Sequence, residues 1–339
     1  MALARVTIQD LADKLGLSKF SVSRALSGKP GVAEATRGRV LRAAHAMGYR
    51  VNAEIAHSVG QILFVRQEIE MVSSEMWLNV QHGAEAEAER LGYSVVPRQA
   101  RFIEADRLDP AVVGLILAVP RSSAITEMAA RTGLPVACAA YPEPMSRFDH
   151  AVCADWEAGM MVARLLGGLG HREVAFVHGS TLPTGRSERY RGFRDGMLDF
   201  AGARVDNIVF DELQGFRRAF LAHVKEGGAP TALFCAHDGI AVSAVSELLR
   251  LGIRIPEDIS VVGYSDFAAA TQISPKLTTV RVPHQEIGAA MVRTIAERLT
   301  NPEGAARPPL RLSLLSELVR RESTGKAQPV RWLPLLQVA

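Results

Sequence analysis

Residues 15–28, LGLSKFSVSRALSG, combine side chains that suit one kind of chemistry. Ser18 and nearby hydroxyls can hydrogen-bond to phosphate oxygens, Arg24 can reach a guanine edge, and Phe20 can contact a thymine methyl group. A helix of this length fits the major groove of double-stranded DNA. The segment is therefore expected to read a DNA sequence.

Three short helices are expected to position these side chains. Thr7 can cap the first helix, and Gly16 suits the tight turn that ends it. Ser18 can cap a second helix over Lys19–Ser27, and a third is expected over Glu34–Met47. The side chains expected to pack between them, at helical spacing, are Ile8, Leu11, Ala12, Leu15, Val22, Ala25, Leu26, Val40, Leu41, Ala44 and Met47. Two helices joined by a glycine turn and supported by a third form a helix-turn-helix.

Charge sets this head apart from the rest of the chain. Residues 1–60 hold nine lysines and arginines against four acids, a net charge of +5, whereas the remainder has a net charge of −2. A basic head on a near-neutral body favours a polyanionic partner for the head alone. The alternative is a basic surface that only aids solubility, and charge by itself does not separate the two.

The head resembles the lactose-repressor (LacI/GalR-type) family of bacterial transcription regulators, both in VTIQDLADKLGLSKFSVSRALSG and in TRGRVLRAAHAMGYRVN. The resemblance implies that Lys19, Phe20 and Arg24 read base edges. It also implies backbone or cap contacts for Ser18, Ser21 and Ser23. The positions that match the family pattern are Thr7, Asp10, Ala12, Gly16, Ser18, Val22, Ser23, Arg24, Leu26, Val32, Thr36, Arg37, Val40, Ala43, Gly48, Tyr49 and Asn52.

The segment after the head departs from the family pattern. Val51 and Ser58 stand where the family usually has a proline and a leucine that wedges into the minor groove. Ile55 or Val59 is the candidate replacement for that wedge. The expected DNA contacts are Thr7, Ser18, Lys19, Phe20, Ser21, Ser23, Arg24, Asn52 and Ile55.

The body alternates strand-like and helical stretches. Strands are expected at Ile62–Val65, Tyr93–Val96, Val112–Val119, Val136–Ala140, Val174–Val177, Ala232–Cys235 and Ile259–Gly263. Helices are expected at Glu75–Leu91, Glu157–Leu169, Ser187–Phe200, Gly239–Leu251 and Gln285–Leu299. This alternation predicts parallel sheets covered by helices, and such sheets bind ligands beyond the carboxyl ends of their strands.

The body also resembles the effector-binding core of the same family, in segments such as GLGHREVAFVHGS and PTALFCAHDGIAVSAVSELLRLGIRIPEDISVVGYSDF. The resemblance implies two α/β lobes like those of periplasmic sugar-binding proteins, with a ligand cleft between them. It assigns Arg189 to the effector's polar groups, and it places His237 and Ser265 where many members have Asn and Asp. The expected effector contacts are Met76, Trp77, Ser122, Asp155, Trp156, Arg189, His237, Asp238 and Asp266.

Several of these residues also have structural interpretations. Trp77 lies at helical spacing with apolar residues and can belong to the core, and Trp156 can be a packing aromatic. Asp238 can be the N-cap of the helix that follows it, and Asp266 can be a turn residue.

Two other protein classes fit the body less well. The sequence has no GxGxxG after the first expected strand and no P-loop, GxSxG or HExxH motif, which argues against the enzymes that use them. A transport binding protein would need a secretory signal, and the first residues lack a long apolar run. No metal-ligand spacing is present, and the three separated cysteines fit a reducing compartment, so we expect no cofactor and a cytoplasmic location.

Together these patterns predict a helix-turn-helix DNA-binding domain at residues 1–50, a short linker at 51–60, a two-lobed core at 61–325 and a tail at 326–339. The fold class is a small all-α head joined to a periplasmic-binding-protein-like α/β core with parallel sheets. The expected activity is repression as a homodimer on a roughly palindromic operator. The expected effector is a sugar or sugar derivative, with a purine or another metabolite as the alternative.

Overall fold

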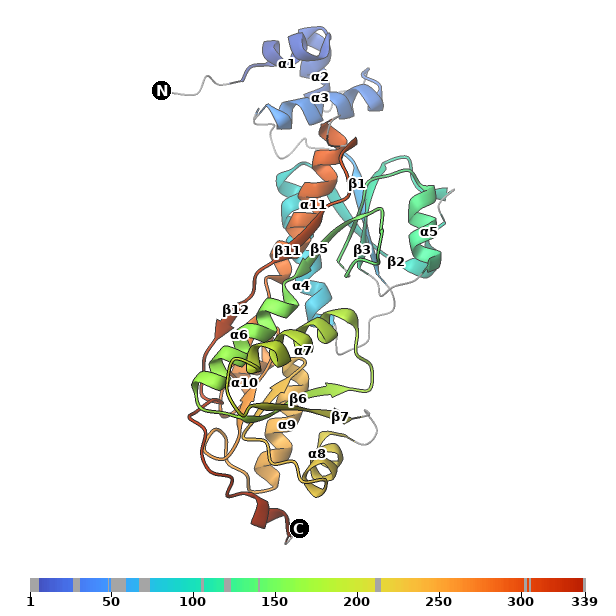
Figure 1. Ribbon diagram of the computed structural model, residues 1–339. Helices are drawn as coiled ribbons and strands as arrows, with labels where there is room; N and C mark the ends of the chain where they lie inside the picture. Colours follow the sequence, from blue (N-terminus) through green and yellow to red (C-terminus); the bar gives the residue numbers. More distant parts are fainter. Residues whose placement is uncertain are drawn as a thin grey trace. The chain divides into compact units, whose positions relative to one another are not determined.

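The computed structural model describes residues 6–26, 31–47, 49, 59–66, 74–104, 107–118, 123–139, 141–210, 215–301, 304 and 306–337. These residues form two compact units, each assembled from separated stretches of chain. The first unit is Met1–Val152 with His284–Leu312, and the second is Cys153–Pro283 with Ser313–Ala339. The elements agree with the predicted class, an all-α head followed by α/β lobes with parallel sheets (Figure 1).

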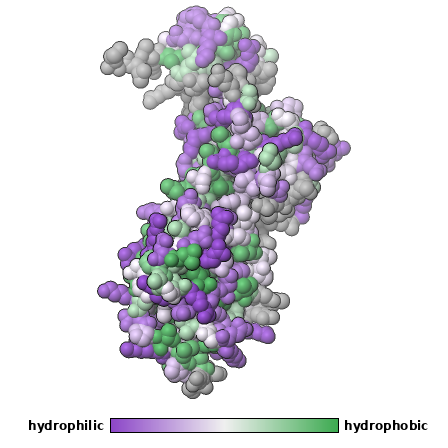
Figure 2. Space-filling model, in the orientation of Figure 1, coloured by the Kyte–Doolittle hydropathy of each residue, from purple (hydrophilic) through white to green (hydrophobic). Residues whose placement is uncertain are grey.

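The head consists of α1 (Ile8–Leu15), α2 (Lys19–Leu26) and α3 (Glu34–Ala46). Thr7 and Asp10 form a capping box at the start of α1, and Gly16 ends this helix with a φ of 64°, a left-handed conformation that glycine adopts without strain. The predicted core is confirmed, since its buried side chains are Leu11, Ala12, Val22, Ala25, Leu26, Val40, Leu41 and Ala44. The visible described surface of the head is mainly hydrophilic (Figure 2).

The α/β part of the first unit has a six-stranded sheet in the order β11-β5-β4-β3-β1-β2. Its strands are β1 (Gln61–Arg66), β2 (Ser94–Gln99), β3 (Val112–Ala118), β4 (Val136–Cys138), β5 (Asp149–Cys153) and β11 (Arg311–Leu314). The helices are α4 (Ser74–Arg90), α5 (Ser123–Arg131) and α11 (His284–Thr300), with a short 3-10 turn, η3 (Ala100–Phe102). α4 packs directly on α11, because Gly83 and Gly288 have no side chain to separate the two backbones.

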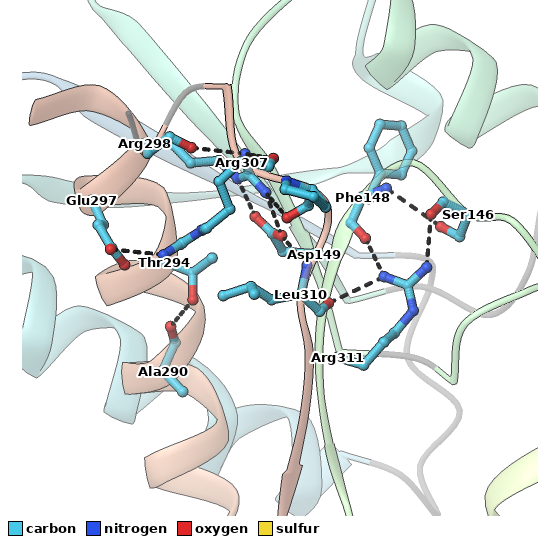
Figure 3. Close-up of polar contacts among 12 residues, drawn as sticks. Ser146, Phe148, Asp149, Ala290, Thr294, Glu297, Arg298, Arg307, Leu310 and Arg311 are labelled. Atoms are coloured by element: carbon cyan, nitrogen blue, oxygen red, sulfur yellow. Dashed lines mark hydrogen bonds and ion pairs between the residues drawn. The ribbon is translucent and has the colours of Figure 1, made fainter. Parts of the chain in front are cut away.

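A buried ion pair fixes the edge of this sheet. The guanidinium of Arg298 on α11 donates to both carboxylate oxygens of Asp149 at 2.5 and 2.7 Å, and the amide of Leu310 donates to the same carboxylate at 2.7 Å (Figure 3). Arg311 donates to the carbonyls of Phe148 and Ser146 at 2.6 and 2.7 Å. These contacts tie β5 and β11 to α11, so a strand that begins with a charged residue is still buried.

The second unit has a four-stranded parallel sheet, β7-β6-β8-β9, and an antiparallel pair, β10-β12. Its strands are β6 (Glu173–Gly179), β7 (Arg204–Phe210), β8 (Ala232–Cys235), β9 (Ser260–Val262), β10 (Thr279–Arg281) and β12 (Glu317–Val319). Its helices are α6 (Asp155–Gly168), α7 (Thr184–Met197), α8 (Gly215–Lys225), α9 (Asp238–Arg250) and α10 (Ala269–Gln272). The rings of Phe176 and Phe193 each meet Phe234 edge to face, and they form the centre of this core.

The tail belongs to the core of the second unit. Trp332 is fully buried, with its ring 5.5 Å from that of Phe220 on α8, and a 3-10 turn, η5 (Leu333–Gln337), follows it. The amide of Ala327 donates to the carbonyl of Leu169 at 2.9 Å. The sequence pattern predicts no structural role for this segment, but Trp332 anchors it in the core of the second unit.

Candidate DNA-reading face and effector site

The start of α2 is fixed by serine hydroxyls. Ser18 Oγ accepts a hydrogen bond from the amide of Ser21 at 3.1 Å and lies 2.8 Å from Ser21 Oγ. This is an N-cap, and it satisfies one of the amides that the first turn of a helix leaves without a partner. Thr7 performs the same role for α1, with Oγ1 accepting from the amide of Asp10. Both predicted contact residues thus have a structural role that leaves them exposed.

The outward side of α2 presents the side chains that the sequence assigns to base reading. Lys19 and Ser23 are exposed, and Phe20 is 68% exposed, an unusual position for a large apolar ring. The guanidinium carbon of Arg24 lies 5.3 Å from the centre of the Phe20 ring, within the range of a cation–π contact. We name Lys19, Phe20, Ser23 and Arg24 the reading face. Of the other predicted contacts, Asn52, Ile55 and Ser122 lie outside the described residues.

Glycines in α6 and α7 bring the main effector candidates together. A Cβ atom on Gly159 would lie 2.2 Å from the carbonyl oxygen of Arg189, and one on Gly192 would lie 1.9 Å from the carbonyl oxygen of Trp156. Only glycine therefore permits the two helix backbones to approach this closely. The contact places Asp155, the first residue of α6, against Arg189 in the middle of α7.

Arg189 and Asp155 form the centre of a buried cluster. Nε and Nη2 of Arg189 donate to Asp155 Oδ1 at 3.0 and 2.7 Å, and Nη1 donates to the carbonyl of Ala236. Tyr264 donates to the same carboxylate oxygen at 2.6 Å and lies under the guanidinium, whose carbon is 3.1 Å from the ring centre. The thiol of Cys153 donates to Asp155 Oδ2 at 3.2 Å. We name these residues, Cys153, Asp155, Arg189 and Tyr264, the Arg189 cluster.

Burial and charge act in opposite directions on the cluster's titratable groups. Burial alone would lower the pKa of Arg189, but the adjacent Asp155 carboxylate raises it above its usual value. Burial raises the pKa values of Cys153 and Tyr264, and the charge of Asp155 raises them further. The cluster therefore holds one buried charge pair, with Arg189 cationic and the thiol and phenol neutral.

His237 and Asp238 lie at the carboxyl end of β8, beside this cluster. The N-cap of α9 is His237, whose Nδ1 accepts from the amide of Ile240 at 3.3 Å, so the interpretation of Asp238 as the cap is wrong. Burial, followed by the charges of Arg186 and Arg189, lowers the pKa of His237 to about 4.

Asp238 connects the start of α9 to β10 and to the segment after β9 instead of capping the helix. It is completely buried, and its two carboxylate oxygens accept from the Thr279 hydroxyl at 2.6 Å and the Phe267 amide at 2.7 Å. Burial raises the pKa of Asp238 to about 6 against the effect of these hydrogen bonds.

Asp266 and Trp156 also have protein partners. Asp266 has a φ of 56°, in the left-handed region, and it accepts from Arg281 Nε at 2.8 Å and Arg321 Nη2 at 2.6 Å. Nε1 of Trp156 donates to the carboxylate of Asp195 at 3.1 Å. Within the second unit the structure thus brings Asp155 and Arg189 close to the carboxyl end of β8, which His237 and Asp238 follow. Met76 and Trp77 belong to the first unit, where both are half-buried on α4.

Tyr264 and the carbonyl of Ala236 belong to the site but are not among the residues predicted from the sequence. Tyr264 directly follows the predicted strand Ile259–Gly263 and precedes Ser265. This position at the carboxyl end of a strand is the feature of the sequence that could have identified it. No group of three or more histidine, cysteine or acidic side chains in the described part of the chain has the arrangement of a metal site.

Two family models match the chain. The model for bacterial regulatory proteins of the lacI family matches residues 7–52, and the model for a periplasmic binding protein-like domain matches residues 163–324. The chain belongs to the lacI family. It is a DNA-binding transcriptional regulator with an effector-type core, and it is not an enzyme.

Named relatives agree along nearly the full length. The HTH-type transcriptional regulator DegA of Bacillus subtilis (strain 168) is 28% identical over 95% of this chain and 98% of its own. The HTH-type transcriptional repressor PurR of Aliivibrio fischeri (strain ATCC 700601 / ES114) is 26% identical over 94% of this chain and 98% of its own.

Among solved structures, the transcriptional regulator CelR in complex with cellobiose has a TM-score of 0.67 and 27% identity, covering 94% of this chain and all of its own. The Lac repressor dimer bound to operator has a TM-score of 0.65 at 22% identity, covering 95% of this chain and 99% of its own, and this likeness supports the fold alone. Among the described residues of this LacI-family chain, no helix has the length and apolar composition needed to cross a bilayer.

Proposed function

We propose that this LacI-family regulator is a cytoplasmic repressor that binds a roughly palindromic operator as a homodimer. The observation that carries the proposal is the reading face of α2. This helix is capped at Ser18, packed on the head core through Val22 and Leu26, and exposes Phe20 beside Arg24. A twofold dimer would present two such helices to two half-sites.

We propose the division of the chain that its sequence pattern predicts. Residues 1–50 form the DNA-binding domain, residues 51–60 the linker, residues 61–325 the effector-binding core, and residues 326–339 the tail. The self-contained core of the head supports the first boundary, because its helices bury their apolar faces against one another. In this proposal Asn52 and Ile55, in the linker, approach the minor groove.

The effector is proposed to be a small sugar or sugar derivative, bound at the carboxyl ends of the strands of the core. A regulator with bound cellobiose has the same fold, as does a LacI-family regulator from Enterococcus faecium with bound ribose. The proposed contacts are Met76, Trp77, Ser122, Asp155, Trp156, Arg189, His237, Asp238 and Asp266. By linkage, the effector changes operator affinity only as far as it distinguishes two conformations, typically by about 1–3 kcal/mol.

Selection of bound sequences from a random double-stranded DNA library tests the proposal, with the full-length chain as the binding protein. We expect enrichment of a palindromic site. Arg24→Ala should lower affinity for that site by about 1–3 kcal/mol and relax its sequence at one position in each half. Arg39→Ala is a matched control, because it removes an exposed arginine of the head from α3 instead of α2.

A library that yields no enriched site would contradict the repressor proposal. An equal loss of affinity in Arg24→Ala and Arg39→Ala would show that only charge matters, and base reading by α2 would then be wrong.

A further inference from the structure

Phe20 and Arg24 lie next to each other on the outward side of α2. They are four residues apart, so their side chains share one side of the helix. The Phe20 ring is 68% exposed, and the guanidinium carbon of Arg24 lies over it, 5.3 Å from its centre. Such a cation is attracted to the electron-rich face of the ring. The two side chains therefore form one surface that has an apolar part beside a hydrogen-bond donor.

Gly31, in the connection between α2 and α3, also lies against this guanidinium. A Cβ atom on Gly31 would be 3.2 Å from Nη2 of Arg24 and 3.6 Å from its guanidinium carbon. The φ of Gly31 is 98°, a left-handed backbone conformation that other residues rarely adopt. Because Gly31 has no side chain, the guanidinium can lie beside this backbone as well as over the ring. Arg24 is accordingly half-buried, whereas Phe20 is exposed.

These two contacts restrict the conformations of Arg24 before any DNA binds. A long side chain loses conformational freedom when a ligand fixes it, and an earlier restraint reduces that cost. The donors of an arginine form a rigid fork, which matches the O6 and N7 acceptors of guanine. A fixed fork is selective for acceptors at one place in the groove, whereas a mobile cation can bind any nearby phosphate.

The distance between the two side chains limits which bases they can reach together. Successive base pairs are about 3.4 Å apart along the DNA axis, and pairs two steps apart are separated by about 7 Å. Groups that are 5.3 Å apart therefore suit adjacent base pairs. In the major groove, a phenylalanine ring fits the C5-methyl group of thymine. Guanine pairs with cytosine, so this methyl group must belong to the base pair next to the guanine.

We propose that Gly31 is a positioning residue for Arg24, and that Arg24 and Phe20 together read one base step, a guanine beside a thymine. Two N–H groups of Arg24 donate to O6 and N7 of the guanine, and the Phe20 ring covers the thymine methyl group. This assignment rests on the proposed operator binding, and it names the bases that the reading face selects.

Two base analogues test the pair in the wild-type full-length chain, on the operator site obtained by selection. Each half of that site should contain a guanine next to a thymine, on either strand. Deoxyuridine in place of this thymine removes only the methyl group and should weaken binding about threefold or more. Replacing the guanine by 7-deazaguanine removes the N7 acceptor and should weaken binding about fivefold or more. Fluorescence anisotropy at one salt concentration measures both ratios of affinity.

Two variants assign each ratio to its side chain. In Phe20→Ala, deoxyuridine should change the affinity by no more than about 1.5-fold, because the ring that meets the methyl group is absent. In Arg24→Ala, 7-deazaguanine should likewise change the affinity by no more than about 1.5-fold. Each variant is compared with itself on the natural and the modified site, so a general loss of affinity cancels.

Gly31→Ala tests the positioning role, and Gly16→Ala is its matched control. Both glycines have a positive φ in a connection between helices of the head, but a Cβ atom on Gly16 meets no atom within 4 Å. Similar losses of stability are therefore expected. Only Gly31→Ala should reduce the 7-deazaguanine ratio, to about half its wild-type value or less, because hydrogen bonds weaken steeply when their geometry changes. A purely structural role would leave this ratio unchanged.

Three results would overturn the assignment while leaving the repressor proposal intact. They are a selected site without a guanine next to a thymine, an unchanged affinity for the deoxyuridine site, and equal 7-deazaguanine ratios in Gly31→Ala and Gly16→Ala. In each case the chain would still select an operator. Failure to select any operator would instead overturn the repressor proposal, and the assignment of the base step with it.

Discussion

The reading face and the Arg189 cluster differ in the burial of their side chains: those of the reading face lie at the surface, and those of the cluster lie in the interior. On α2, Phe20 and Lys19 are exposed, and their conformation depends on one short helix and its serine cap. In the second unit, Arg189 is 7% exposed, donates to Asp155 and to the carbonyl of Ala236, and lies over the ring of Tyr264. Changes at the reading face should therefore alter affinity without altering stability, whereas changes in the cluster should alter both.

The largest expected effect comes from breaking the cluster's ion pair. Asp155→Ala leaves the buried guanidinium of Arg189 without its counter-charge and should reduce the free energy of unfolding by about 3–5 kcal/mol. Urea unfolding followed by tryptophan fluorescence measures this loss. Asp206→Ala, which breaks a more exposed pair with Arg204, should cost about 1 kcal/mol or less. Similar losses for the two variants would contradict the contrast.

Two glycines, Gly192 in the second unit and Gly16 in the head, extend the comparison to the backbone. Gly192→Ala forces a Cβ atom into the Trp156 carbonyl and should cost about 1–3 kcal/mol by separating α6 from α7. Gly16→Ala in the head meets no atom within 4 Å, so its cost should be about 1 kcal/mol, from the left-handed φ alone. Thermal unfolding of both variants checks the order, and a larger loss for Gly16→Ala would reverse the explanation.

The pH dependence of the free energy of unfolding tests His237 and Asp238, which lie beside the cluster. The expected effect is about 1–2 kcal/mol. The pKa of His237 is about 4 in the folded chain and ordinarily 6.5. As the pH falls, the imidazole is therefore protonated first in the unfolded chain, and the folded chain loses stability between these two pH values. Asp238 has a pKa of about 6 against 3.8, so the folded chain takes up that proton first and stability is gained as pH falls.

The two contributions nearly offset each other in the wild-type chain. From pH 7 to pH 5, the free energy of unfolding of Asp238→Asn should therefore decrease by about 1–2 kcal/mol more than that of wild type. For His237→Asn, this decrease should be about 1–2 kcal/mol smaller than in wild type. Urea unfolding at the two pH values measures both differences. Identical pH profiles for the three proteins would rule out these titrations.

The smallest expected effect on stability is at the reading face. Phe20→Ala removes an exposed ring and its contact with Arg24, so the free energy of unfolding should change by about 0.5 kcal/mol or less. Affinity for the selected operator should fall by about 0.5–1 kcal/mol or more, measured by fluorescence anisotropy. Phe20→Tyr, which keeps the ring, should retain most of the affinity. A larger loss of stability than of affinity would show that Phe20 stabilises the head and does not contact DNA.

The same contrast explains what could be predicted from the sequence. In the head, caps, turn and apolar spacing are all local, and the expected helix over Glu34–Met47 is observed as Glu34–Ala46. The strand Ala232–Cys235 also agrees with the prediction. By contrast, β5 begins with Asp149 and His150, residues that do not look like a buried strand, because its burial depends on Arg298 far along the chain.

The candidate site shows the same limit. The family resemblance identified Arg189, but its partners Asp155 and Ala236 lie 34 and 47 residues away, and the Asp155–Tyr264 contact spans 109 residues. No periodic pattern records such pairs. The prediction for Asp238 failed by one residue, since a histidine can accept at a helix start as an aspartate does and His237 comes first.

The order of segments along the chain has a consequence for biosynthesis. The first unit needs α11, which packs on α4 but is made only after residues 153–283 of the second unit. The second unit then needs β12, the partner of β10, which is made after α11. Neither unit can complete its core as the chain leaves the ribosome, so both must close late, by contacts between distant segments. A break in synthesis between α11 and β12 would leave a complete reading face on a chain whose second unit is unfinished.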